Sequence, residues 1–329
     1  MTKAGLARDI VKEYIEIGLK NNTSYSKKFI STVLQSRHPD LFKSVEDARD
    51  VVRAVLGAAG KRGRTSVMPN LKEDFALMEQ PIVECDKAPY IVPKQYKRAL
   101  VLSDIHSRFY DRQALETAID YGLKKNADIC IINGDLLDFY GQSKFDKNPL
   151  ILAQFLSERD FAIDLLELLQ KYFGKVVYKK GNHDIRRERY IQLKMAEIPE
   201  AEGLLSISDY VFFNGSTVDV VEDYNIIEFG KLNILHGHEY YGGGIHVAYT
   251  RLNKAMDNIL SGHSHVTQTS LKKTIKDEFY GPWTTGCLCD LSPRYNPYNN
   301  WTNGFAFVER DDKGEFIVEN KQIIKGKVF

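Results

Sequence analysis

Five short clusters of aspartate, asparagine and histidine constrain this 329-residue chain most, because each directly follows an apolar, β-prone run. The runs cover residues 98–103, 129–133, 176–179, 232–235 and 258–260, and helical patterns lie between the first three, at roughly 111–126 and 150–173. Alternation of strand and helix predicts an α/β fold with a largely parallel sheet. In such folds, polar side chains that follow the strands meet at their carboxyl ends.

The clusters supply carboxylates, imidazoles and one carboxamide. They are Asp104-Ile105-His106, Gly134-Asp135-Leu136-Leu137-Asp138, Gly181-Asn182-His183-Asp184, His236-Gly237-His238 and Gly262-His263-Ser264-His265. Divalent metals bind such mixed oxygen and nitrogen ligands. Two ions about 3.5–4 Å apart can hold a phosphoryl group and activate a water. One such cluster alone is commonly a turn or a surface histidine, but five together, each after its own strand, predict one metal site.

The ordered series D-x-H, G-D-x-x-D, G-N-H-D, H-G and G-H-x-H resembles that of the calcineurin-like metallophosphoesterases, over residues 104–265. The resemblance implies a four-layer αββα sandwich, here preceded by a small all-α module. It also implies a binuclear metal-dependent hydrolase of phosphoric esters. Manganese is the metal we expect first, and iron, zinc, nickel or magnesium suit the same ligand types.

The resemblance also implies a role for each motif residue. Asp104, His106 and His265 would bind one ion, Asn182, His236 and His263 would bind the other, and Asp135 would bridge the two. His183 would stay outside the metal ligands and give a hydrogen bond to phosphate or a proton to the leaving oxygen. Asp138 would orient His183, although a carboxylate there could also serve a helix N-terminus. His238 is either a substrate contact or a residue that supports the ligands.

The substrate class follows less directly from the sequence. The third motif ends in Asp184, as in the family's phosphodiesterases, whereas its protein phosphatases carry glutamate. We therefore expect hydrolysis of phosphodiester bonds in a nucleic acid (DNA or RNA) or a nucleotide. The alternatives are a phosphomonoesterase on a small metabolite or nucleotide, and a metal-binding scaffold without catalysis.

Several further side chains near the motifs could contact such a substrate. Arginine binds phosphate with two hydrogen bonds, and aromatic rings stack on bases. Solvated arginines and ordinary aromatic packing are the commoner uses of both. The candidates are Arg108, Arg186, Arg187, the loop 240–244 and the loop 294–301.

The N-terminal part differs in charge from the rest. Residues 1–66 read as three helices and hold 13 Lys and Arg against 7 Asp and Glu, in a chain whose net charge is +1. They end in the basic segment Lys61-Arg62-Gly63-Arg64. This module could bind nucleic acid, or present a solvated or protein-docking surface. We expect a linker packed on the next domain at 67–95 and the catalytic domain at 96–329.

The composition is typical of a globular protein, and we expect no association with a membrane. No run of 18 apolar residues and no secretory signal occurs. The four cysteines, Cys85, Cys130, Cys287 and Cys289, are too few and too scattered for a disulfide framework, so we expect a cytoplasmic protein. Cys287 and Cys289 are interpreted as buried thiols on one face of a strand.

Overall fold

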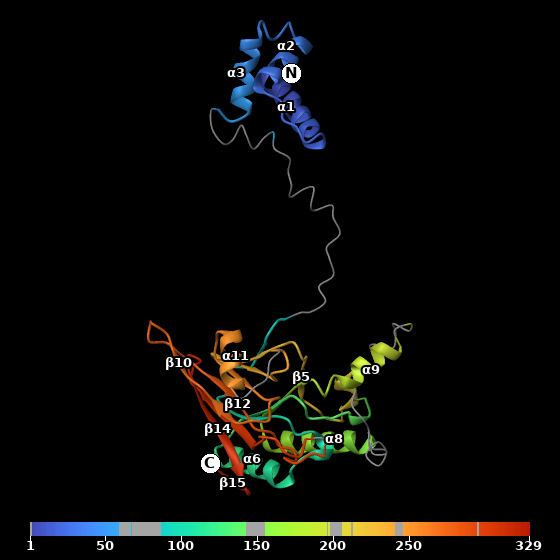
Figure 1. The fold of residues 1–329 in the computed structure, drawn as a ribbon, viewed down its shortest axis with the longest axis vertical. Coiled ribbons are helices and arrows are strands. Elements are labelled where there is room, and N and C mark those ends of the chain that lie inside the picture. The colour runs from blue at the N-terminus through green and yellow to red at the C-terminus, as the bar shows by residue number, and fades with distance from the viewer. Residues whose placement is uncertain are drawn as a thin grey trace. The chain divides into compact units, whose positions relative to one another are not determined.

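The computed structural model describes residues 2–58, 67, 87–142, 155–195, 197, 206–211, 213–240, 246–294 and 296–329. The chain divides into two compact units, residues 1–83 and 84–329 (Figure 1). The basic segment Lys61–Arg64 and most of the expected linker lie outside the described residues. The boundaries expected after residues 66 and 95 therefore stay predictions.

The described part of the first unit has three helices, as the sequence predicts: α1 (Lys3–Lys20), α2 (Lys27–Arg37) and α3 (Val45–Val55). Ser26 Oγ accepts a hydrogen bond from the Phe29 N–H, and Ser44 Oγ accepts one from the Asp47 N–H, both at 3.1 Å. These two serines cap α2 and α3. The apolar faces of the helices meet in a buried core that includes Val11, Leu34, Phe42 and Val52.

Two mixed β-sheets form the second unit. The seven-stranded sheet has the order β15 (Lys327–Val328), β14 (Phe316–Ile324), β13 (Asn303–Arg310), β2 (Arg98–Leu102), β3 (Ile129–Asn133), β4 (Lys175–Lys179) and β5 (Asp219–Val221). The six-stranded sheet has the order β1 (Tyr90–Ile91), β6 (Ile227–Phe229), β7 (Leu232–Leu235), β8 (Ile259–Ser261), β12 (Pro282–Thr284) and β9 (Gln268–Thr269). Strands β2 to β5 are parallel, as predicted, and the β13–β14 hairpin pairs antiparallel to β2. A separate hairpin joins β10 (Lys272–Lys273) and β11 (Phe279–Tyr280).

Helices cover the outer faces of both sheets (Figure 1). The remaining helices in the residues that the structure describes are η1 (Ser107–Phe109), α6 (Arg112–Lys124), η2 (Tyr140–Gln142), α8 (Phe155–Tyr172), α9 (Arg186–Lys194), α10 (Ile207–Tyr210) and α11 (Val247–Ala255). Helices α6 and α8 contact the seven-stranded sheet, whereas α11 contacts β8, β9 and β12 of the six-stranded sheet. The unit is therefore a four-layer αββα sandwich, which confirms the expected fold.

The alternation of side chains along the parallel strands builds two separate cores. In β2, Leu100 and Leu102 face α6 and α8, whereas Ala99 and Val101 face the other sheet. All four are fully buried, because a strand in the middle of a four-layer fold is covered on both faces. This covering explains why the strand runs are continuously apolar.

One local prediction was wrong. Cys287 and Cys289 are buried, but they form only isolated bridges, with Asn303 and Tyr110 respectively, and lie on no strand. Residues 285–288 donate backbone hydrogen bonds to several different neighbours, among them Ser261, Thr302 and Asp104, so no ladder develops. Among the described residues, no helix is long and apolar enough to cross a membrane.

Candidate metal centre

The five sequence clusters lie at the carboxyl ends of β2, β3 and β4 in one sheet and of β7 and β8 in the other. Backbone hydrogen bonds join the turns that follow these strands. The Asp104 N–H donates to Gly134 O at 3.1 Å, the His106 N–H donates to Asp135 O at 2.9 Å, and the Gly262 N–H donates to His236 O at 2.8 Å. The turns therefore support one another.

Five of the predicted ligand residues have a left-handed backbone. Their φ values are 56° at Asp104, 51° at His106, 54° at Asp135, 65° at His263 and 58° at His265. Residues other than glycine rarely adopt this conformation, which costs of order 1–3 kcal/mol each and is concentrated at functional sites. The chain thus turns sharply as it leaves β2, β3 and β8.

Asp184 ties the second cluster to the third. Its Oδ2 accepts hydrogen bonds from the N–H groups of Asp135 and Gly181, both at 2.7 Å, and its Oδ1 accepts one from Leu137 at 2.9 Å. Burial, with Asp135 nearby, raises the pKa of Asp184 to about 6. The carboxylate that suggested a substrate class in the sequence is fully buried and supports the loops.

Two motif glycines leave room for ligand carboxylates. A Cβ on Gly181 would overlap Asp135, and a Cβ on Gly262 would overlap Asp104 Oδ2 and Ser103. Glycine is therefore needed at these positions for close approach of neighbouring turns.

A first group of donors lies around His106 and His265. Their Nε2 atoms are 3.3 Å apart, and His265 Nε2 lies 3.2 Å from Asp104 Oδ1. Two atoms that share one ion at about 2.1 Å lie roughly 3.0–3.5 Å from each other. The spacing thus suits ligands of a single ion.

A second group lies around His236. Its Nε2 is 3.2 Å from Asp135 Oδ2, and His263 offers a ring nitrogen within 4.8 Å of both residues. Asp135 Oδ2 also lies 3.9 Å from His106 Nε2, so this carboxylate stands between the two groups. Asn182 is flanked by Gly181 and His183, both of which approach Asp135.

Several buried oxygen and nitrogen atoms that could bind a metal at this site have no hydrogen-bond partner in the described part of the chain. They include Asp104 Oδ1, Asn182 Oδ1 and His236 Nε2. An unpaired buried polar atom costs about 1–3 kcal/mol, so a cluster of them calls for an ion or a ligand. The donor set therefore fits divalent cations.

The pKa values of these side chains show the demand for positive charge. Burial opposes protonation of His265 and His236, yet Asp104 raises the pKa of His265 to about 10, and Asp135 with Asp104 raises that of His236 to about 9. His263 differs, because burial and the neighbouring His236 lower its pKa to about 3. Bound cations would neutralise the same carboxylates.

His183 and Asp138 form a pair at the edge of the two groups. His183 Nδ1 lies 2.7 Å from Asp138 Oδ1, which is also 3.1 Å from His106 Nδ1. Burial opposes ionisation of Asp138, but these two contacts hold its pKa well below the usual range. As a carboxylate, Asp138 accepts both hydrogen bonds and directs the Nε2 atoms of both rings toward the site.

The other candidates from the sequence are placed unequally. Arg186 Nη2 lies 2.8 Å from His183 Nε2, whereas the Arg187 guanidinium stacks over Tyr210 at 4.6 Å. Arg108 lies in η1 and is half-buried. Trp301, from the loop 294–301, packs edge-on against His265 at 4.2 Å, and residues 241–244 lie outside the described part.

His238 lies next to the second group. Its ring centre is 5.5 Å from that of His236, and its Nε2 is 3.7 Å from Asp223 Oδ2. Its neighbour Glu239 accepts a hydrogen bond from the His236 N–H at 3.2 Å and pairs with the buried Lys179 at 3.2 Å. His238 therefore lies beside the donor set but outside the groups that converge on a common point.

Arg251 also supports the site, and nothing in the sequence pointed to it. It is 2% exposed and donates to Ser261 Oγ at 2.5 Å and to Gly262 O at 2.8 Å, directly before the fifth cluster. Only the folded chain brings α11 under that turn.

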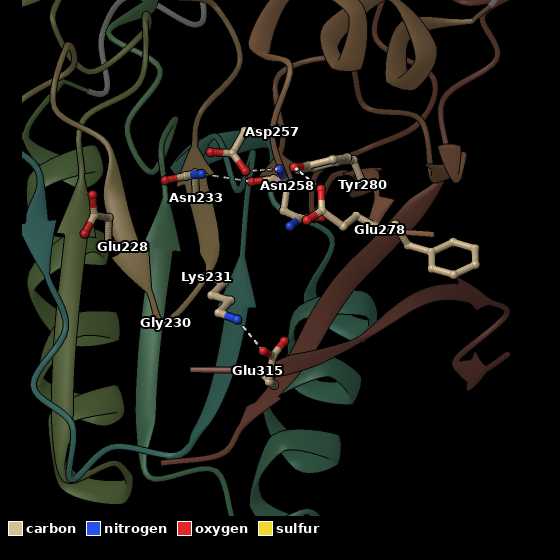
Figure 2. A pocket seen from close by; sticks show the side chains of 10 residues that line it. Glu228, Gly230, Lys231, Asn233, Asp257, Asn258, Glu278, Tyr280 and Glu315 are labelled. Carbon is tan, nitrogen blue, oxygen red and sulfur yellow. Dashed lines mark hydrogen bonds and ion pairs between the residues drawn. The ribbon is translucent and has the colours of Figure 1, made fainter. Parts of the chain in front are cut away.

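A separate pocket of about 590 Å³ lies at the opposite ends of β7 and β8, where both strands begin (Figure 2). Its lining includes Lys231, which pairs with Glu315, and Asn233, which donates to Asn258 O at 3.1 Å. None of the predicted site residues lines it.

This chain is similar to several known proteins. A family model described as calcineurin-like phosphoesterase matches residues 97–267, which are just over half of the chain. The Gene 54 protein of Mycobacterium phage L5 is 29% identical over 180 residues, which are 51% of this chain and 69% of that protein. Among solved structures, Vps29 of Cryptosporidium parvum has a TM-score of 0.41 at 10% identity, covering 71% of this chain and 95% of that one. The phosphoesterase YfcE of E. coli has a TM-score of 0.34 at 15% identity, covering 64% and 87% respectively.

Proposed function

Since this chain belongs to the calcineurin-like phosphoesterase family, we propose that it is a binuclear metal-dependent phosphodiesterase acting on a nucleic acid or a nucleotide. The observation that carries the proposal is the position of Asp135. Its Oδ2 lies 3.2 Å from His236 Nε2 and 3.9 Å from His106 Nε2, between the two donor groups. A carboxylate oxygen in that position can bridge two cations.

The assignment of ligands follows the two groups. Asp104, His106 and His265 would hold one ion, Asn182, His236 and His263 would hold the other, and Asp135 would be shared. Two ions held there would lower the pKa of water and neutralise phosphoryl oxygens. Manganese suits this set, and iron, zinc, nickel and magnesium are the other candidates.

His183 would act on the leaving oxygen. Asp138 fixes its Nδ1–H, so Nε2 is the atom that delivers a proton or a hydrogen bond. Arg186 now donates to that Nε2 at 2.8 Å. An arriving phosphate offers the guanidinium a stronger acceptor, which would free Nε2 to take a proton from solvent and then give it to the leaving oxygen.

The preference for a diester rests on the Gly-Asn-His-Asp motif alone. Asp184 itself is buried away from solvent, so its position adds no support for that preference. We test it with the purified chain on bis-p-nitrophenyl phosphate and p-nitrophenyl phosphate, with Mn²⁺ and after treatment with a chelator. We expect faster cleavage of the diester, loss of activity on chelation and recovery with Mn²⁺. Faster cleavage of the monoester would replace the proposal by a phosphomonoesterase on a small metabolite or nucleotide. Cleavage of neither substrate would favour a scaffold.

A reducing, cytoplasmic location suits the proposed enzyme. The three described cysteines, Cys130, Cys287 and Cys289, are all free and buried. Free thiols persist in reducing compartments.

The N-terminal unit would bring nucleic acid to the site. Some of its basic side chains are already paired, as Lys3 is with Asp47 and Arg37 is with Glu13. Lys27 and Lys28, in the first turn of α2, are exposed and form no ion pair within the described residues. These two lysines are the candidates for contacts to phosphate.

Deletion of residues 1–66 is expected to weaken DNA or RNA binding while sparing hydrolysis of the small diester. Binding by the intact chain should fall steeply with salt, because each neutralised phosphate releases counterions. Substituting Lys27 and Lys28 by alanine should reduce the slope of log affinity against log salt by about 2, one unit for each lost phosphate contact. Arg49→Ala is the matched control, since Arg49 already pairs with Glu46 at 3.0 Å. Absent or salt-independent binding by the intact chain would leave a protein-docking role for this unit.

A further inference from the structure

A thiol lies beside the first group of metal donors. Cys289 Sγ and ring nitrogens of His106 and His265 all lie within 4.8 Å of one another, and all three residues are buried. Two atoms that bind one ion at about 2.0–2.3 Å can be no more than roughly 4.6 Å apart, so this spacing is close to what a common ion requires.

The backbone fixes Cys289 at that place. Its two neighbours in sequence are hydrogen-bonded to the turn that follows β2: the Leu288 N–H donates to Asp104 O at 3.0 Å, and the Asp290 N–H donates to Phe109 O at 2.7 Å. Asn303 Nδ2 donates to Cys289 O at 3.0 Å. The segment that carries the thiol is therefore tied directly to the ligand Asp104.

Cys287 differs from Cys289 although both are buried. Its thiol contacts the carbonyl oxygens of Thr302 at 3.6 Å and Cys289 at 3.9 Å, and it also interacts with the His265 side chain. It belongs to none of the groups of side chains that converge on a common point. Both thiols therefore lie beside His265, and only the thiol of Cys289 also converges with the ring nitrogen of His106.

We propose that Cys289 Sγ is a ligand of the ion held by Asp104, His106 and His265. The inference rests on the proposed function, since it concerns one of the two ions. Binding replaces the thiol proton by the metal, and the proton passes to solvent. A thiolate is a soft ligand, so this position selects zinc, ferrous iron or cobalt over manganese, whereas the group around His236 has only nitrogen and oxygen donors. The two positions would therefore prefer different metals, and the manganese proposed for the site as a whole suits the group around His236.

Cobalt tests the bond itself. The full-length chain, stripped of metal by a chelator, is titrated with Co²⁺ under reducing, oxygen-free conditions, and the absorbance is recorded. We expect visible d–d bands together with a near-ultraviolet charge-transfer band from a thiolate–cobalt bond. Cys287→Ser should retain that charge-transfer band, and Cys289→Ser should lose it while still binding cobalt. Zinc affinity should fall at least about tenfold in Cys289→Ser, because even the loss of a residue that only supports a metal ligand lowers metal affinity by about that factor.

Each outcome decides one point. If the unmodified chain bound cobalt without a charge-transfer band, no thiolate would be a ligand, although the metal site itself would still exist. The spectrum of the unmodified chain alone decides this point. A band that survives in Cys289→Ser and disappears in Cys287→Ser would show that Cys287 is the ligand, and it would overturn the proposal for Cys289. Failure of the unmodified chain to bind cobalt at all would contradict the proposed function as well.

Discussion

Replacing Asp135 by alanine is expected to abolish turnover and to remove both ions together. The carboxylate stands between the two donor groups, with Oδ2 3.2 Å from His236 Nε2, and its Oδ1 accepts a hydrogen bond from the His183 N–H at 2.8 Å. Loss of one fixed group at a reacting centre costs about 10²–10³-fold in turnover, and a group shared by two ions should exceed that range. Elemental analysis and turnover of bis-p-nitrophenyl phosphate measure the two effects.

Asp135→Asn is the matched control, because it keeps the shape and an acceptor for the His183 N–H while removing the charge. We expect it to fold like the parent by thermal melting and to lose at least one ion. A fully metallated Asp135→Ala variant with normal turnover would show that this carboxylate does not bridge.

Replacing His183 by alanine is expected to leave the metal content near normal and to reduce turnover by about 10²–10⁴-fold, the usual range for acid–base catalysis. His183 Nδ1 is held by Asp138 at 2.7 Å, and its Nε2 lies 3.9 Å from Asp135 Oδ2. His183 also forms a possible metal-binding group with His106 and Asp135, so the metal content of this variant decides between a proton donor and a ligand.

The leaving group provides a second measurement for His183. A leaving oxygen of low pKa needs little protonation, so the loss in His183→Ala should shrink as the substrate's leaving group improves. His236→Ala serves as the comparison, because removal of a ligand should lower metal content for every substrate. If His183→Ala lost metal as His236→Ala does, His183 would be a ligand and not the acid.

Much of the architecture could be predicted from the sequence, because each polar motif directly follows the end of an apolar strand. Each apolar run before a cluster became a strand, with bounds within about one residue, as in β3 at Ile129–Asn133. The helices α6 and α8 followed from their apolar periodicity. The αββα layering came from the family resemblance, since no periodicity distinguishes one parallel sheet from two packed sheets.

The support of the site could not be predicted, because it depends on contacts between distant segments. Arg251 reaches Gly262 O only because α11 packs on the six-stranded sheet. Cys289 approaches His106 only through the bonds that join residues 288 and 290 to the turn after β2. The sequence motif contains Asp184, but only the structure shows that its carboxylate holds two loops together.

The left-handed turns also govern which substitutions the site can accept. At Asp104, His106, Asp135, His263 and His265 the backbone alone would prefer glycine, yet the chemistry demands a side chain. Glycine at any one of them would relieve local strain and delete a donor in the same step. Backbone stability and the proposed metal binding therefore make opposite demands at these five positions.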